Sequence, residues 1–189
     1  MAKGNVGSAG IYLGALSKTL FHASWANQYL ALLRADPNLS ADAEVHRVRC
    51  LSLDKDYPTL SLPKEKVLSL LLEKNSQNRM AFEYLIAWYL LNKQLGKFVS
   101  NIERLRDFGY IELPTHYEEA ALIYVYSAGK GVALGGYQSS PTLRRQIEDF
   151  SRILRGYGAD KRAAFNDLAR NYRDTYFFYY IYANPGFEK

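Results

Sequence analysis

The amino-acid sequence predicts an all-α fold in which antiparallel helical hairpins stack into a short right-handed α-solenoid with a concave surface. The first observation is one helical hairpin between Asn78 and Tyr110. Its first helix carries apolar residues at spacings of three and four, as an amphipathic helix requires. The second observation is that similar segments recur along the chain, without a convincing strand signal. We therefore expect seven to nine helices in a single domain of residues 1–189.

The region before the hairpin contains two helix signals and one soft boundary. The chain before Ser40 is left unassigned, because four glycines between positions 4 and 14 weaken any helix there. Ser40 is a candidate N-cap for the next helix, and Pro63 begins another that ends at Lys74. Residues 53–63 hold two prolines and a charged run, so we expect a soft boundary there. The apolar residues of the helix after Ser40 are Val45, Val48 and Leu51.

The first helix of the hairpin is apolar on most of its surface and should be buried on most sides. Residues 92–96 are polar or glycine, which suits a reversal of the chain, and the second helix should end at Gly109. Neither helix can bury its apolar faces alone, so such hairpins stack on neighbours. The apolar residues of the two helices are Ala81, Phe82, Tyr84, Leu85, Ile86, Trp88, Tyr89, Leu90 and Leu91, and then Phe98, Ile102 and Leu105.

A repeat is suggested by the helix that follows. Thr115 and Glu118 lie three residues apart at its start, which is the spacing of a capping box. Aligning Ala81 with Ala120 gives a period near forty residues. This period lies above the roughly 34 residues of a tetratricopeptide repeat and near the roughly 40 to 47 of HEAT-type repeats. The pattern therefore predicts a tetratricopeptide-like α-solenoid as a class, without matching a repeat consensus.

Two further helices are marked by their caps. A long loop is expected between Gly129 and Ser140, after which Ser140 and Pro141 begin a helix that ends at Gly156. Asp160 begins the next helix. The apolar residues of these two helices are Leu143, Ile147, Phe150 and Leu154, and then Ala164, Phe165, Leu168, Ala169 and Tyr172.

Few residues of this chain suggest chemistry. His116 and Glu119 lie three apart on one helix, but the other two histidines lack the companions that a di-metal site needs. We therefore expect no metal, no cofactor and no catalytic residue. Glu118 or Glu119 should instead complement the positive N-terminal end of its own helix. Cys50, the single cysteine, is interpreted as a small core residue rather than a reactive thiol.

The net charge and the aromatic content of the chain limit the classes of function that the sequence supports. The net charge of +5 is mild, and the basic residues between Arg144 and Arg173 alternate with acidic ones, so nucleic-acid binding is not expected. The run from Tyr176 to Tyr182 contains six aromatic residues among seven. One interpretation is a last helix packed on the preceding pair with its hydroxyls at the rim. The other is a recognition surface for protein or sugar.

Three segments resemble the soluble C-terminal region of a family of uncharacterised bacterial proteins. They read NRMAFEYL at 78–85, LPTHYEEA at 113–120 and DTYFFYY at 174–180. In that family a multi-spanning membrane segment precedes a tetratricopeptide-like helical region. The resemblance covers roughly the last two thirds of the chain and implies no activity. It implies a soluble fragment, anchored at the inner membrane only through a segment absent from this chain.

The function expected from these observations is a non-catalytic protein-interaction or scaffold module that holds a protein or peptide in a helical-repeat groove. The alternative is a tyrosine-rich surface that binds a glycan or a small ligand. The candidate partner-binding residues are Tyr84, Trp88, Tyr124, Tyr126, Tyr179 and Tyr180.

Overall fold

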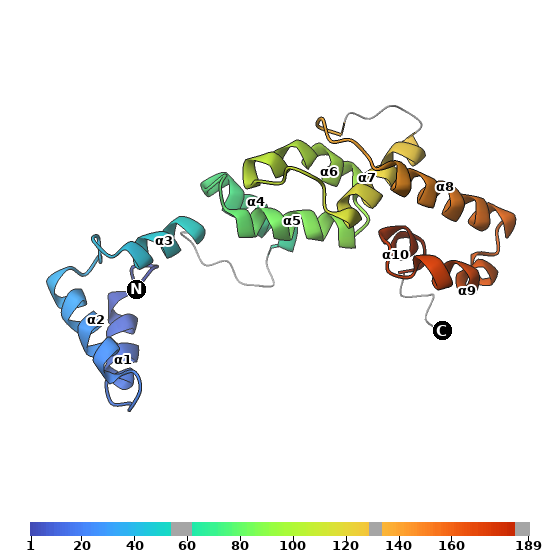
Figure 1. The fold of residues 1–189 in the computed structure, drawn as a ribbon. Coiled ribbons are helices and arrows are strands. Elements are labelled where there is room, and N and C mark those ends of the chain that lie inside the picture. Colours follow the sequence, from blue (N-terminus) through green and yellow to red (C-terminus); the bar gives the residue numbers. More distant parts are fainter. Residues whose placement is uncertain (54–61, 129–133, 184–189) are drawn as a thin grey trace. The chain divides into compact units, whose positions relative to one another are not determined.

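Every regular element in the described residues of the computed structural model is a helix (Figure 1). The structure describes residues 1–53, 62–128 and 134–183. The all-α fold class is confirmed, and these residues form ten α-helices and one 3-10 helix, more than the seven to nine expected. The helices are α1 Val6–Leu16, α2 Ala23–Ala35, α3 Ala43–Leu51, α4 Lys64–Lys74, α5 Arg79–Leu91, α6 Leu95–Ser100, η1 Ile102–Phe108, α7 Thr115–Ala128, α8 Pro141–Gly156, α9 Lys161–Tyr172 and α10 Tyr176–Tyr182.

The chain divides into two compact units, Met1–Phe82 and Glu83–Lys189. The soft boundary expected at 53–63 falls mainly on residues 54–61, which lie outside the described residues. No helix in the described part of the chain combines the length and apolar character needed to cross a membrane.

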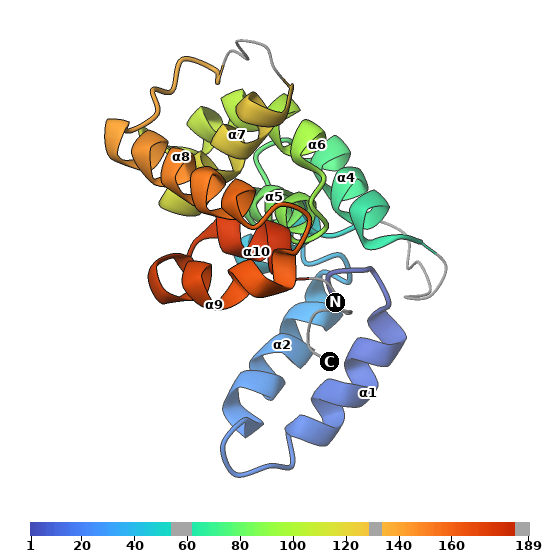
Figure 2. The same ribbon diagram turned by 90° about the vertical axis from the view of Figure 1, so that its right-hand side faces the viewer.

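The region left unassigned before Ser40 forms α1 and α2, which lie side by side as a hairpin (Figure 2). The Asn5 side chain accepts a hydrogen bond from the Ser8 N–H and caps α1. The glycines of α1 do not prevent the helix, because tertiary packing overrides a weak intrinsic propensity. The buried residues of this hairpin are Ala9, Leu13, Ala26 and Leu33.

Helix α3 begins later than the sequence suggested. Asp42, not Ser40, is the N-cap, and its carboxylate accepts a hydrogen bond from the Val45 N–H at 2.8 Å. Asp42 is the better cap because the helix begins directly after it, at Ala43, which brings the donor within reach. Arg49 donates from Nε to the carbonyl of Ala2 at 2.9 Å and ties α3 to the N-terminus.

The interpretation of Cys50 as a core residue is wrong, because the Cys50 side chain is exposed. Val45 is the buried residue of α3. Cys50 follows Val45 by five positions, which places it about 140° away around the helix. Apolar neighbours in the sequence therefore did not indicate the side on which the thiol lies. The Cys50 sulfur is 3.8 Å from His46 Nδ1 on the same helix.

The predicted burial of the first helix of the hairpin is confirmed, since Phe82, Leu85, Ile86 and Tyr89 are all buried in α5. The turn after α5 differs from the expectation. Lys93 has the left-handed φ of 56°, whereas Gly96 lies within α6. The turn needs its left-handed residue directly after the last turn of α5, and Gly96 comes too late for that role.

The second helix of the hairpin is broken rather than continuous. Helix α6 ends at Ser100, and the 3-10 helix η1 continues from Ile102 to Phe108. Gly109, with a φ of 83°, ends the segment as predicted. The apolar residues that define its buried face, Phe98, Ile102 and Leu105, are all buried.

The caps of α8 and α9 are confirmed. Ser140 accepts a hydrogen bond from the Thr142 N–H, with Pro141 as the first helical residue, and Asp160 accepts one from the Ala163 N–H. The predicted capping box at the start of α7 is not formed. Helix α7 begins at Thr115 itself, and its first carbonyl acceptor belongs to the preceding proline. The expected loop from Gly129 includes residues 129–133, which lie outside the described residues.

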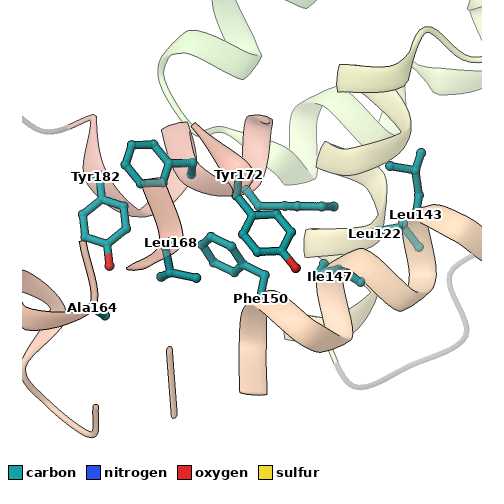
Figure 3. Packing of buried hydrophobic residues seen from close by; sticks show 10 residues of the cluster. Leu122, Leu143, Ile147, Phe150, Ala164, Leu168, Tyr172 and Tyr182 are labelled. Atoms are coloured by element: carbon teal, nitrogen blue, oxygen red, sulfur yellow. The ribbon is translucent and has the colours of Figure 1, made fainter. Parts of the chain in front are cut away.

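The core of the second unit lies between α7, α8, α9 and α10 (Figure 3). Helix α7 packs against α6, α8 and α10, and α9 packs against α8 and α10. The chain thus returns at its last helix to α7, three helices earlier. The buried residues of this core are Leu122, Leu143, Ile147, Phe150, Ala164, Leu168, Tyr172, Phe177, Phe178 and Tyr182.

Candidate interaction site beside the C-terminal helix

An open, mainly apolar cavity of about 420 Å³ lies where α5, α7 and the start of α10 meet. We name it the α5–α10 groove. Its apolar floor comes largely from the last two turns of α5, whose chain reverses directly afterwards. The lining residues are Ala87, Leu90, Leu91, His116, Tyr117, Arg173, Asp174, Thr175, Tyr176 and Tyr179.

The carboxylate of Glu119 holds the start of α10 in place beside this groove. Glu119 lies on α7 and is only 2% exposed. Its Oε2 accepts a hydrogen bond from the buried backbone N–H of Tyr176 at 2.7 Å. The same oxygen lies 2.9 Å from Nδ1 of His116. Glu119 therefore serves the free N–H groups of α10 rather than those of its own helix, which corrects the sequence expectation.

Glu118 also acts outside its own helix. Its Oε1 accepts a hydrogen bond from the backbone N–H of Ser140, the residue that caps α8. The two adjacent carboxylates of α7 thus bind the starts of α10 and α8. Glu118 also lies in the first turn of α7, where its charge complements the N-terminal end of that helix as expected.

Two tyrosine hydroxyls of α10 donate hydrogen bonds to the last carbonyls of α5. The Tyr176 hydroxyl donates to the carbonyl of Leu90 at 2.6 Å, and the Tyr179 hydroxyl donates to the carbonyl of Leu91 at 2.9 Å. The last carbonyls of a helix lack i+4 partners within the helix. The Tyr179 hydroxyl supplies one to Leu91, and the Tyr176 hydroxyl is a second donor to Leu90 beside the Lys93 N–H. The aromatic strip is packed, as the first interpretation expected, but mainly on α7 and α9 rather than on the preceding pair. The hydroxyls of Tyr176 and Tyr179 bind backbone carbonyls instead of lying free at the rim.

The end of α5 also forms a Schellman motif. The N–H of Gln94 donates to the Tyr89 carbonyl at 2.8 Å, and the N–H of Lys93 donates to the Leu90 carbonyl at 3.0 Å. Lys93 occupies the left-handed position that glycine favours, at a cost of roughly 1 kcal/mol for a residue with a Cβ. The motif turns the chain so that the Lys93 side chain reaches α10.

Apart from the His116–Glu119 pair, the charges beside the groove have a small excess of positive sign. The Lys93 ammonium lies 5.8 Å from the ring centroids of both Tyr179 and Tyr180. Burial, and then the charge of Lys161, lower the pKa of Lys93 from its ordinary value of 10.5. The groove itself is lined by one cation, Arg173, and one carboxylate, Asp174.

A second cavity, of about 260 Å³, lies between α7, α8 and α10. It brings together two of the predicted partner-binding residues, Tyr126 and Tyr180. The Tyr126 hydroxyl donates to Glu148 of α8 at 3.0 Å. Adjacent residues of α10 thus face different cavities, since Tyr179 lines the α5–α10 groove and Tyr180 lines this one.

The other predicted partner-binding residues line neither cavity. Tyr84 is exposed and Trp88 is half-buried, both on α5. Tyr124 is half-buried, and its ring lies close to Gly96 of α6. A side-chain carbon at position 96 would be only 3.8 Å from that ring. The groove residues that the sequence analysis missed include Ala87, Leu91 and Arg173. No local pattern marks them, because the groove forms only when α10 folds back.

His116 and Glu119 form a structural pair. The partners of Glu119 are a histidine and a backbone N–H, which stabilise a buried carboxylate. Among the described residues, no group of three or more His, Cys, Asp or Glu side chains is placed to hold a metal ion. The arrangement can therefore orient α10 and can bind apolar side chains in the groove.

Several buried tyrosines keep their protons more strongly than free tyrosine does. Burial raises the pKa of Tyr117 from 10.0 to about 12. Burial, followed by the hydrogen bond that its hydroxyl donates to Asp149, raises the pKa of Tyr172 to about 12. Burial also raises the pKa of Tyr176 well above its ordinary value.

Residues 1–183 match a family that is described as "Family of unknown function (DUF6057)". No curated protein and no solved structure matches the chain.

The two hydroxyls that close α5 should contribute unequally to stability. Tyr176→Phe should lower the free energy of unfolding by about 1 kcal/mol, because it removes a buried hydrogen bond and keeps the ring. Tyr179→Phe removes an exposed hydrogen bond and should cost less than about 0.5 kcal/mol. Urea unfolding of both variants measures the difference. Equal losses would show that the Tyr176 bond to α5 is not the stronger one.

Stability should fall as the pH rises above 10. The folded state keeps the protons of Tyr117 and Tyr172 up to about 12, whereas the unfolded chain releases them near 10.0. Each such tyrosine therefore removes up to about 1.4 kcal/mol per pH unit in this range. Lys93 has the opposite effect on stability, because its pKa is lower in the folded state than in the unfolded chain. This effect is confined to pH values below about 10.5. Urea unfolding over this pH range measures how the free energy of unfolding depends on pH. Part of the phenolate absorbance of the folded protein should appear only above pH 10. Complete ionisation of the folded protein near pH 10 would contradict the prediction.

Proposed function

Because this chain belongs to the family DUF6057, whose description assigns no activity, we propose its function from geometry: a non-catalytic interaction module for a protein partner. The observation that carries the proposal is the α5–α10 groove, an open and mainly apolar cavity of about 420 Å³. In this proposal the groove holds the apolar side chains of a peptide segment. Its volume lies within the range of about 300 to 1,000 Å³ that is usual for binding pockets.

The floor of the groove suits an amphipathic segment. Leu91 is 61% exposed although it ends a helix whose other apolar residues are mostly buried. Ala87 lies one turn earlier and leaves room above the floor. A partner helix that enters such a groove presents apolar residues three, four and seven positions apart. Two or three such side chains would cover Leu91.

The charges favour an acidic residue next to those apolar anchors. Arg173 lines the groove, and Lys93 lies over the ring of Tyr179, which also lines it. Asp174 provides the opposing carboxylate. Apart from the His116–Glu119 pair, two cations meet one carboxylate, so a partner carboxylate near Arg173 and Lys93 complements the site.

The finer features predicted from the sequence are part of this proposal. We interpret the helices from α5 onward as tetratricopeptide-like hairpins whose stack closes when α10 returns to α7. Attachment of the chain to a larger membrane-associated protein rests on the sequence resemblance alone. The glycan alternative has weaker support, because the hydroxyls of Tyr126 and Tyr179 bind Glu148 and the Leu91 carbonyl within the protein.

A peptide selection tests the proposed groove. Random peptides displayed on phage are selected against the full chain, and the enriched sequences are measured as labelled peptides by fluorescence polarisation. We expect apolar anchors at helical spacing next to a carboxylate. Leu91→Arg should raise the dissociation constant at least about tenfold, because it places a charge on the apolar floor.

The matched control is Ile111→Arg, which changes another exposed apolar residue on the connection between η1 and α7, outside the groove. Binding should be unchanged in this variant. A failure to enrich any peptide, or equal binding by Leu91→Arg and the unmodified chain, would contradict the proposed function. A glycan array probed with the same variants tests the alternative, which predicts sugar binding that Tyr180→Ala abolishes.

A further inference from the structure

The loop end of the α1–α2 hairpin exposes large apolar side chains. Leu20 and Phe21, in the connection between the two helices, are 96% and 90% exposed. Ile11 and Tyr12 on α1 are 75% and 72% exposed, and Trp25 in the first turns of α2 is 44% exposed. All five lie within about two helical turns of residues 17–22, which join the helices. We name these five residues the loop-end patch.

The packing of the two helices against each other does not involve these five exposed residues. The hairpin is held by small and aliphatic residues on its inner faces, Ala9, Leu13, Ala26 and Leu33. The aromatic ring of Trp25 contacts that of Tyr29 with centroids 4.8 Å apart, so it stands fixed on α2. Several large apolar side chains exposed at one end of a hairpin indicate a surface that binds something.

The charges around the patch are of one sign. Residues 1–35 contain no Asp or Glu, and of their basic residues Lys18 lies at the loop end, whereas Lys3 and Arg34 lie toward the other end of the hairpin. Lys18 lies in the connection itself, two positions before Leu20. The first carboxylate, Asp36, is engaged at the far end of the hairpin, where it accepts hydrogen bonds from the Asn38 and Ser40 N–H groups.

We propose that the loop-end patch binds the surface of a bilayer that contains anionic lipids. Leu20 and Phe21 enter the boundary between headgroups and acyl chains. The amphipathic rings of Trp25 and Tyr12 lie at the headgroup level, where such rings concentrate. Lys18 meets lipid phosphate, to which a basic residue near the membrane is attracted.

A lipid surface fits these observations better than a protein partner does. The two most exposed residues stand in the connection at the tip of a hairpin, a shape that can enter a soft boundary. Apolar insertion combined with basic charge is the usual mode of interfacial binding. The contact is made by residues of this chain, unlike the attachment that the sequence resemblance implies.

Flotation with vesicles tests the proposal. The full chain is mixed with vesicles of phosphatidylcholine alone, or of phosphatidylcholine with about one quarter phosphatidylglycerol. Binding should be stronger to the anionic vesicles and should weaken with salt. Replacing Leu20 and Phe21 together by serine should weaken binding at least about tenfold, because both apolar side chains are lost. Lys18→Gln should remove part of the preference for anionic lipid.

Fluorescence locates the contact. The chain has two tryptophans, Trp25 and Trp88, so Trp88→Phe leaves Trp25 as the single reporter. Its emission should shift to shorter wavelength when anionic vesicles are added. The matched control is Ile111→Ser, since Ile111 is also 90% exposed but belongs to the other unit. This control should bind vesicles like the unmodified chain.

Three outcomes would overturn the proposal. The first is the absence of flotation with anionic vesicles, and the second is undiminished flotation of the Leu20→Ser, Phe21→Ser variant. The third is self-association in sedimentation without vesicle binding, abolished by the same two substitutions. That last result would assign the patch to contact with a second copy of the chain. Circular dichroism of each variant verifies that the helices are retained.

Discussion

The buried carboxylate of Glu119 is the constraint on which the second unit depends. A carboxylate that is 2% exposed must be paired, because transfer of an unpaired charge out of water costs several kcal/mol. Its partners are the Tyr176 N–H at 2.7 Å and His116 at 2.9 Å. The Tyr176 N–H is buried as well and needs an acceptor. Each group therefore satisfies the other, and α10 is fixed against α7.

The rest of the site follows from the position of α10. Once Tyr176 is placed, its hydroxyl and that of Tyr179 reach the last carbonyls of α5. The rings of Phe177, Phe178 and Tyr182 then complete the core with α8 and α9. The α5–α10 groove and the cavity of Tyr126 and Tyr180 are both lined by residues of this same short helix. A helix of seven residues has little stability of its own, so these contacts determine both surfaces.

Local signals allowed much of this fold to be predicted, whereas the site depends on distant pairs. Ser140 and Asp160 cap α8 and α9 as predicted, because a cap acts over three residues. Helix α1 was not predicted, since its glycines mask packing that only α2 supplies. Glu119 and Tyr176 are 57 residues apart, and no sequence spacing reveals such a pair. The sequence likewise could not show which of the candidate partner-binding tyrosines line a cavity, because the cavities form only when α10 returns to α7.

Hydrogen exchange of the α10 amides in Glu119→Ala measures the central claim most directly. The Tyr176 N–H and its neighbours in α10 should exchange at least about tenfold faster than in the unmodified chain. The amide of Phe150, in α8, should change much less, which separates local release of α10 from global destabilisation. Glu112→Gln, at an exposed carboxylate outside this contact, is the control. Unchanged protection of α10 in Glu119→Ala would contradict the account, because α10 would then be held without the carboxylate.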